Sequence, residues 1–221
     1  MGNPLMMKEI KKPKLLLVEG LDEIAFMGAI FKAMDIDDIQ LWDAKGKTNI
    51  HSSLGAVRLL PGFEAVTSIG VIRDADDNAK GAFDSVKASL ATHGYPVPQQ
   101  VGENAEKNGL AASVFIVPGE DVPGMLETLV WQSFENEQIA GEVRGFIERC
   151  SDLLPEEQHG EQRAAGPGGW RKPRSPEKAR MQAFLATMIE ARPRMGMGAE
   201  KGYFDLTNGC FAALRGYIAK L

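Results

Sequence analysis

The sequence is poor in the features that mark secreted or membrane proteins. Of its 221 residues only two are cysteines, Cys150 and Cys210, and neither belongs to a CxxC pair or to a His/Cys ligand spacing. This scarcity argues against a disulfide framework and against a zinc ribbon. The longest clean apolar run near the N-terminus has four residues, which is too short for a signal-peptide core or a membrane span. We therefore expect a cytoplasmic protein with no membrane partner.

A surplus of basic residues is also absent. The chain has 25 Lys and Arg against 30 Asp and Glu, so its formal net charge is −5 and no overall basic field attracts nucleic acid. This counts against a nuclease that works unaided, although bound divalent ions would offset several acids and residues 163–180 supply a local basic strip. The hydrophobic content of 44% and the charged content of 25% are typical of a globular protein. We expect one α/β core with an appendage.

No ATPase motif is complete. Gly46-Lys47-Thr48 matches the end of a Walker A loop, but the first glycine of that motif would fall at Leu41. We therefore do not expect an ATPase. A glycine–lysine loop at the end of a strand can still contact a phosphate, and that role stays open for Lys47.

The most informative segment is an apolar run that ends in an acid. Residues 15–18 read Leu-Leu-Leu-Val, and Glu19 follows at a position where an unpaired charge would be costly to bury. Asp22 begins the next predicted helix. It is either a metal ligand or a residue whose negative charge stabilises the start of that helix.

A second segment repeats this design. Residues 66–72 form an apolar strand, and Asp74 and Asp76 follow it with side chains on the same side of an extended chain. Together with Glu19 they would form a cluster of carboxylate oxygens, the ligands that suit a hard cation such as Mg²⁺. For these acids to meet, the strand at residues 14–18 must be the neighbour of the strand at residues 66–72.

Hydrophobic periodicity divides most of the remaining N-terminal part into alternating strands and helices. Apolar residues recur at helical intervals in residues 22–34, 49–60 and 79–93, and short apolar strands fill residues 39–42 and 113–117. This alternation predicts an α/β fold of three layers, with a parallel four-stranded sheet between helices. Ligands of such sheets bind at the carboxyl ends of the strands.

We divide the chain into an α/β core, residues 14–134, and a helical C-terminal extension, residues 135–221, that packs on the core. The stretch at residues 96–109 predicts a long loop or a weak hairpin. Residues 151–176 are rich in Gly, Pro, Arg and Glu and predict a flexible loop. Further helices are predicted at residues 123–134, 138–150, 176–191 and 207–221.

Several of these motifs resemble a known family. The pairing of Val18-Glu19-Gly20 with Asp74-Ala75-Asp76, each at the end of an apolar strand, resembles the Toprim domain of primases, topoisomerases, OLD-type nucleases and small ribosomal-RNA maturation nucleases. Val117-Pro118, residues 123–127 and residues 201–205 resemble small stand-alone bacterial Toprim proteins of unassigned function. The resemblance covers most of the chain and implies a Toprim-like fold.

The resemblance implies a phosphodiester-transfer enzyme that depends on Mg²⁺ or Mn²⁺, in the form of a nuclease acting on DNA or RNA. Glu19 and Asp74 would hold one ion, and Asp76 with Glu127 or Asp22 would position a second. Glu127 corresponds to the extra acid of OLD-type domains, although an exposed acid at a helix start has the same appearance.

A lysine would complete the catalytic set of Glu19, Asp74 and Asp76. We assign Lys201, with Lys178 as the alternative, because a lysine near a carboxylate metal centre stabilises charge on a phosphate. A topoisomerase would need large additional domains and a primase a zinc-binding module, and neither is present in the sequence. The rival interpretation is a Toprim-fold module that binds metal or nucleic acid, or regulates a protein partner, without catalysis of its own.

Overall fold

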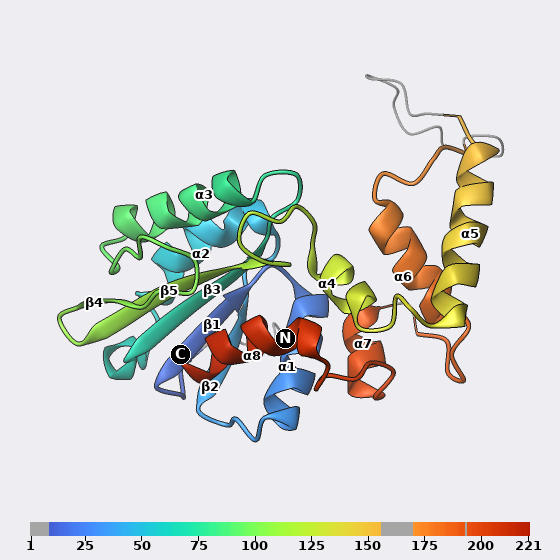
Figure 1. Cartoon of the computed structure of the whole chain (residues 1–221). Helices are drawn as coiled ribbons and strands as arrows, with labels where there is room; N and C mark the ends of the chain where they lie inside the picture. Colours follow the sequence, from blue (N-terminus) through green and yellow to red (C-terminus); the bar gives the residue numbers. More distant parts are fainter. Residues whose placement is uncertain (1–8, 156–169, 193) are drawn as a thin grey trace, which may run out of the picture.

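A computed structural model describes residues 9–155, 170–192 and 194–221 (Figure 1). The protein is an α/β protein built on a five-stranded mixed sheet in the order β2-β1-β3-β5-β4. β1 pairs in parallel with both β2 and β3, and β3 pairs in parallel with β5. The predicted contact between the two strands that precede the acids is therefore confirmed. The strands are Lys14–Val18 (β1), Ile39–Asp43 (β2), Ser68–Asp74 (β3), Ala105–Lys107 (β4) and Leu110–Val117 (β5).

The fifth strand corrects the predicted four-stranded parallel sheet. β4 pairs antiparallel with β5 at the edge of the sheet. The two are joined by Asn108 and Gly109, whose φ angles of 53° and 78° are both positive. An Asn-Gly pair favours this two-residue turn because both residue types tolerate the left-handed region. Residues 96–109 were predicted as a loop or a weak hairpin, and both occur: residues 96–104 form a loop, and residues 105–109 form the first strand and the turn of a hairpin with β5.

Helices cover both faces of the sheet. α2 and α3 lie on one face and α1 and α8 on the other, whereas α4, α5, α6 and α7 lie beyond the carboxyl ends of the parallel strands (Figure 1). Within the described residues, no helix is long and apolar enough to cross a membrane. The described helices are Leu21–Ala33 (α1), Ile50–Val57 (α2), Ala79–Thr92 (α3), Leu126–Gln132 (α4), Gln138–Asp152 (α5), Pro176–Ala186 (α6), Met195–Glu200 (α7) and Ala212–Ala219 (α8).

Each strand contributes alternate side chains to two hydrophobic cores. In β1, Leu15 and Leu17 join the core beneath α2 and α3, whereas Leu16 and Val18 join the core that contains α1 and α8. This is the two-residue alternation of an extended chain with both faces covered. The alternation also determines on which face of the sheet each side chain at a strand end lies. It therefore determines which acids can meet in the candidate site.

The C-terminal helices share the second of these cores with the sheet. Phe211 packs against Phe26 of α1 with ring centroids 5.8 Å apart, and Tyr217 of α8 stacks on Phe115 of β5 at 5.1 Å. The hydroxyl of Tyr217 contacts that of Ser113 at 3.2 Å, so this buried polar group has a partner. Most of the loop predicted at residues 151–176 lies outside the described residues.

Helix α7 was not predicted, because its sequence Met-Gly-Met-Gly-Ala-Glu contains two glycines, which disfavour helix. One of them, Gly196, lets α7 lie directly against α1. A Cβ on Gly196 would lie only 2.3 Å from the backbone oxygen of Asp22 and 2.7 Å from the Cβ of Ala25. Two of the predicted helices are shorter in the structure than in the prediction. The helix predicted at residues 176–191 is α6, Pro176–Ala186, and the helix predicted at residues 207–221 is α8, Ala212–Ala219.

The close contact of α1 with α7 predicts a large difference between two glycine substitutions. Gly196→Ala should destabilise the protein by about 1–3 kcal/mol, because the new methyl group overpacks this contact. Gly141 is an exposed residue of α5 with no atom near its Cβ position, so Gly141→Ala should stabilise the protein by roughly 0.5–1 kcal/mol. Urea unfolding of both variants measures the difference, and equal effects would contradict the packing described here.

Candidate functional site

Glu19 and Asp74 lie side by side at the carboxyl ends of β1 and β3. The backbone N–H of Asp74 donates to Glu19 Oε1 at 3.2 Å. Asp74 itself is buried, and its Oδ1 accepts a hydrogen bond of 3.0 Å from the backbone N–H of Leu126, the first residue of α4. The helix start thus stabilises the buried carboxylate, and the parallel pairing of the two strands brings the two acids together.

Two acids in first helical turns extend this pair. Glu23 lies in the first turn of α1, and Glu127 lies in the first turn of α4. The negative charge of Glu23 acts on Glu19, on Asp74 and on Glu127. Glu23 was not assigned to the site from the sequence, although it follows Glu19 by four residues and its helix starts directly after β1. We name Glu19, Glu23, Asp74 and Glu127 the carboxylate cluster.

The pKa of every carboxyl group in the carboxylate cluster is raised, first by burial and then by repulsion from its neighbours. Burial raises the pKa of Asp74 well above its ordinary value, and repulsion from the other three members of the cluster raises it further. The hydrogen bond from the Leu126 N–H opposes this rise only in part. The site therefore holds negative charge at a cost, and a bound cation would reduce that cost.

Lys178, in the first turn of α6, is the lysine at the carboxylate cluster. Its Nζ lies 3.8 Å from Glu127 Oε1. Partial burial lowers the pKa of Lys178, but attraction from all four carboxylates outweighs burial, so the pKa is raised overall. Lys201, the lysine assigned from the sequence, instead forms an ion pair of 3.0 Å with Glu190. The structure thus brings the alternative lysine to the cluster.

Asp76 borders the cluster and faces a different partner. Its Oδ2 accepts a hydrogen bond of 2.6 Å from Lys47 Nζ, which belongs to the glycine–lysine loop after β2. Its backbone has a positive φ of 48°, and its carbonyl accepts from the N–H of Gly124 at 2.7 Å. The charge of Asp76 adds to the raised pKa of Glu19, after burial and the charge of Glu23.

Asp22 has hydrogen-bonding partners of its own. Its Oδ1 accepts from the backbone N–H of Gly196 at 2.6 Å, and its Oδ2 accepts from that of Met195 at 3.2 Å. These are orphan donors at the start of α7, so the carboxylate caps that helix from α1. The contact engages both oxygens of Asp22 and so disfavours metal ligation. The helix that Asp22 caps is α7 and not its own helix α1, at whose start the sequence had placed the role.

The chemistry of the carboxylate cluster fits a hard divalent cation, since all of its donor atoms are carboxylate oxygens. The side chains do not stand as a formed ligand set: across residues 9–155, 170–192 and 194–221, no group of three or more His, Cys, Asp and Glu is arranged to hold an ion. Ion binding would need the long side chains of Glu19, Glu23 and Glu127 to turn toward Asp74, whose carboxylate is held by α4.

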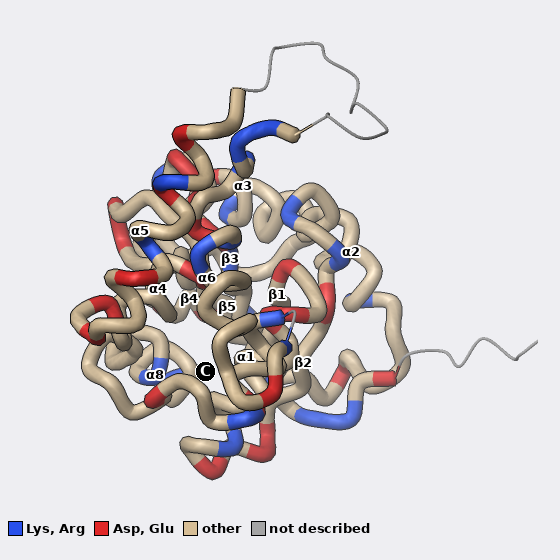
Figure 2. Tube along the Cα trace, turned by 90° about the vertical axis from the view of Figure 1, so that its right-hand side faces the viewer, with Lys and Arg blue, Asp and Glu red and all other residues tan. Residues whose placement is uncertain are grey.

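An open groove lies next to the cluster. A cavity of about 590 Å³ runs between the Asp76 loop, the start of α4 and the start of α6. Its charged lining residues are Asp76 and Asp77 from the loop after β3, and Arg174, Glu177 and Lys178 from the start of α6. Figure 2 looks onto this end of the molecule and shows acidic and basic segments interspersed over it. The groove therefore has charges of both signs, and its two basic residues, Arg174 and Lys178, lie at the start of α6 beside Glu177.

Comparison with protein-family models matches residues 13–221 to one family, described as "Protein of unknown function (DUF3226)". The match includes the whole sheet and all helices from α1 to α8. Neither the curated proteins nor the solved structures contain a match to the chain.

The raised pKa values predict how stability depends on pH in the presence of chelator. A group whose pKa is raised by folding stabilises the folded state below its ordinary pKa, and this stabilisation is lost as the pH rises through the raised pKa. Asp74→Asn removes the group with the largest rise but keeps an acceptor for the Leu126 N–H. We expect it to be more stable than the wild type by about 1–3 kcal/mol at pH 8, and not at pH 4.

Urea unfolding across this pH range, in EDTA, measures the effect. Asp205→Asn is the matched control, because hydrogen bonds from Thr207 lower the pKa of Asp205 and its loss should not stabilise the protein at pH 8. If Asp74→Asn and Asp205→Asn change the stability in the same direction at pH 8, the carboxylate cluster is not under electrostatic strain.

Substitution of Asp22 should lower the stability of the protein at neutral pH, whereas substitution of Asp74 should raise it at pH 8. Asp22→Ala removes both acceptors at the start of α7 and should destabilise the protein by about 1–2 kcal/mol at neutral pH. Asp22→Asn keeps one acceptor oxygen and should cost less. Thermal melts in EDTA distinguish the two roles, since an Asp22→Ala protein of unchanged or increased stability would exclude the capping role.

Proposed function

We propose that the chain, which belongs to the DUF3226 family, is a Mg²⁺- or Mn²⁺-dependent phosphodiester-transfer enzyme, a Toprim-like nuclease acting on DNA or RNA. One observation carries this proposal. Four carboxyl groups of raised pKa lie near one another at the carboxyl ends of two neighbouring parallel strands, with Lys178 beside them. That edge of an open α/β sheet is where ligands bind, and the cluster has enough oxygens for one or two ions.

The best-fixed members of the cluster are the two at the strand ends. A backbone N–H holds one oxygen of Glu19 and another holds one oxygen of Asp74, so each carboxylate keeps its second oxygen for an ion. A bound Mg²⁺ or Mn²⁺ would polarise the phosphodiester and neutralise charge on the leaving oxygen. Glu19 and Asp74 are thus the primary ligands in this proposal.

The remaining groups have the properties needed for proton transfer and charge stabilisation. Burial and repulsion raise the pKa of Glu23, so its carboxylate is a better proton acceptor than an ordinary one and suits the deprotonation of an attacking water. Glu127 supplies a further ligand next to the groove. Lys178 carries a positive charge at the same edge and would stabilise the charge on the reacting phosphate.

A second candidate function is supported by a specific observation. The carboxylates of the described residues do not stand as a formed ligand set, and the net charge of −5 gives little general attraction to nucleic acid. A module of the same fold that binds metal or nucleic acid, and acts through a protein partner, fits these two observations. The cleavage experiment separates this candidate from the nuclease.

The nuclease predicts cleavage of labelled single- or double-stranded DNA or RNA that requires Mg²⁺ or Mn²⁺ and stops in EDTA. Asp74→Asn should lower the rate by at least about 100-fold, because it removes a charged ligand. Lys178→Met should lower the cleavage rate by roughly 100- to 1,000-fold, because the loss of one donor that stabilises transition-state charge has an effect of this size. Lys201→Met tests the lysine assigned from the sequence, and its pairing with Glu190 predicts a smaller loss.

Melting temperatures of all variants show whether each remains folded. Equal losses for Lys178→Met and Lys201→Met would remove Lys178 from its assigned role. Wild-type cleavage that Asp74→Asn does not reduce would place the reaction elsewhere. If no substrate is cut but Mn²⁺ raises the melting temperature of the wild type and not of Asp74→Asn, the binding module replaces the nuclease.

A further inference from the structure

Strand β3 delivers opposite charges to the two faces of the sheet. Arg73 and Asp74 are adjacent in an extended chain, so their side chains leave on opposite faces. Asp74 joins the carboxylate cluster, whereas the Nη1 of Arg73 donates to the backbone oxygen of Ala82 in α3 at 3.3 Å. A positively charged region on the α2–α3 face therefore lies directly behind the acidic one.

A small cavity opens beside Arg73. Its volume is about 210 Å³, and it lies between the glycine–lysine loop, the first turn of α2 and the middle of α3. No acidic residue is among the described residues that line this cavity, although the chain as a whole is acidic. The polar lining residues are Lys47, Thr48, His51, Arg73, Ser85 and Ser89.

The guanidinium of Arg73 has donors without acceptors. Its Nε is buried and makes no hydrogen bond within the described part of the chain, where the bond to Ala82 is the one that the side chain forms. A guanidinium has five N–H donors, and buried donors are rarely left unsatisfied. Arg73 lines the cavity, so an anion bound there would pair with the charge of this guanidinium.

The other polar side chains of the lining fall into two groups. Ser89 and His51 are already paired: Ser89 Oγ donates to the backbone oxygen of Ser85 at 2.9 Å and lies 3.3 Å from His51 Nδ1, so neither is counted as a donor to a ligand. The hydroxyl groups of Thr48 and Ser85 line the same cavity. Ammonium, guanidinium and hydroxyl donors thus converge on one small space.

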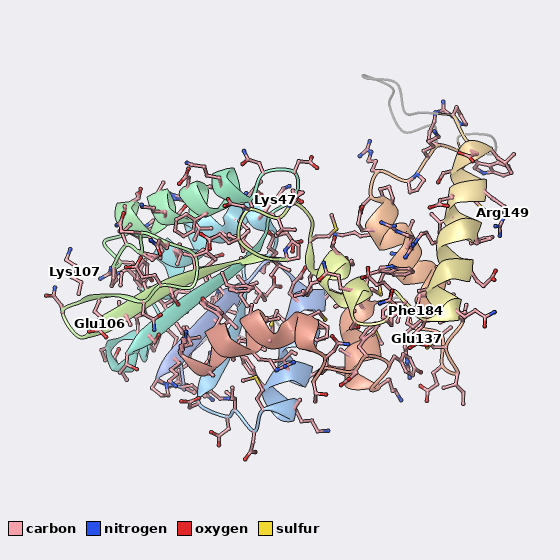
Figure 3. The ribbon with its side chains drawn as sticks, in the orientation of Figure 1. Lys47, Glu106, Lys107, Glu137, Arg149 and Phe184 are labelled. Atoms are coloured by element: carbon pink, nitrogen blue, oxygen red, sulfur yellow. The ribbon has the colours of Figure 1, made fainter. Side chains whose placement is uncertain are left out.

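Lys47 connects this cavity to the carboxylate site. It is a cavity-lining residue, and its Nζ forms the 2.6 Å ion pair with Asp76, which borders the carboxylate cluster. Figure 3 labels Lys47 at the end of the sheet where the parallel strands finish, on the side of α2 and α3. An extended chain of phosphates that reached the carboxylate cluster would pass this lysine.

We propose that the cavity lined by Lys47, Arg73 and Ser85 is a phosphate-binding site. Its donors are those that recognise phosphate oxygens, and its volume lies below that of pockets for drug-sized ligands but leaves room for one phosphate group. The phosphate assigned to it belongs to a nucleic-acid strand, next to the phosphodiester at the carboxylate cluster. The strand as the source rests on the proposed function, whereas the phosphate site does not.

The test adds charge at Ser85, an exposed residue of α3, so that the fold is left intact. Inorganic phosphate is titrated by calorimetry into the full chain in EDTA at constant ionic strength. Saturable binding to the wild type should weaken at least about tenfold in Ser85→Asp, because like charges then meet, and strengthen in Ser85→Lys. Ala91→Asp, an exposed residue of the same helix outside the cavity lining, should bind as the wild type does.

A second arm identifies the source of the phosphate. A labelled single-stranded oligonucleotide is bound in EDTA, and Ser85→Asp should weaken its binding much more than Ala91→Asp does. Oligonucleotide binding that is indifferent to Ser85→Asp overturns the assignment to a strand. A wild type that binds no phosphate, or phosphate binding that is equal in all variants, overturns the site itself. Neither arm requires cleavage, so its failure is distinct from failure of the nuclease.

Discussion

The parallel pairing of β1 with β3 is the constraint on which the rest of the site depends. It carries the backbone N–H of Asp74 to Glu19 Oε1, and so it holds two carboxylates side by side in a place that is largely removed from water. Two buried negative charges at this separation destabilise a fold unless something offsets them. The N–H at the start of α4 offsets part of the cost at Asp74, and Lys178 offsets part of it at Glu127. In the proposed function, a divalent cation offsets the rest.

The same strand geometry explains why acidic and basic groups lie so close together without neutralising one another. Alternation along β3 sends Asp74 to the side of α1 and α4, and Arg73 to the side of α2 and α3. The sheet separates the side chains of Arg73 and Asp74, and Lys47 pairs with Asp76 at its edge. A ligand that carries several phosphates could engage both sides, the anionic groups at Arg73 and a cation-bound phosphate at Asp74.

Much of the fold could be predicted because its signals are local. The apolar runs before Glu19 and Asp74 identify β1 and β3, and hydrophobic periodicity identifies α1, α2 and α3. The missed features depend on contacts between distant parts of the chain. Helix α7 has a poor helical sequence and forms against α1, where Asp22 caps it across more than half the length of the chain. Nothing in the spacing of Lys178 and Lys201 tells which packs near Glu127, because that depends on how α6 docks beside α4.

In the proposed site, protons and a divalent cation compete for the carboxylate cluster. Metal binding to carboxyls of raised pKa must release protons. The direct measurement is calorimetric titration of Mn²⁺ at about pH 6, in two buffers of different ionisation enthalpy, which counts the protons released for each ion bound. We predict net proton release by the wild type, a smaller release at pH 8 as the carboxyls become ionised, and weaker binding with less release in Asp74→Asn. Mn²⁺ binding without proton release at pH 6, or binding that Asp74→Asn leaves unchanged, would contradict the account.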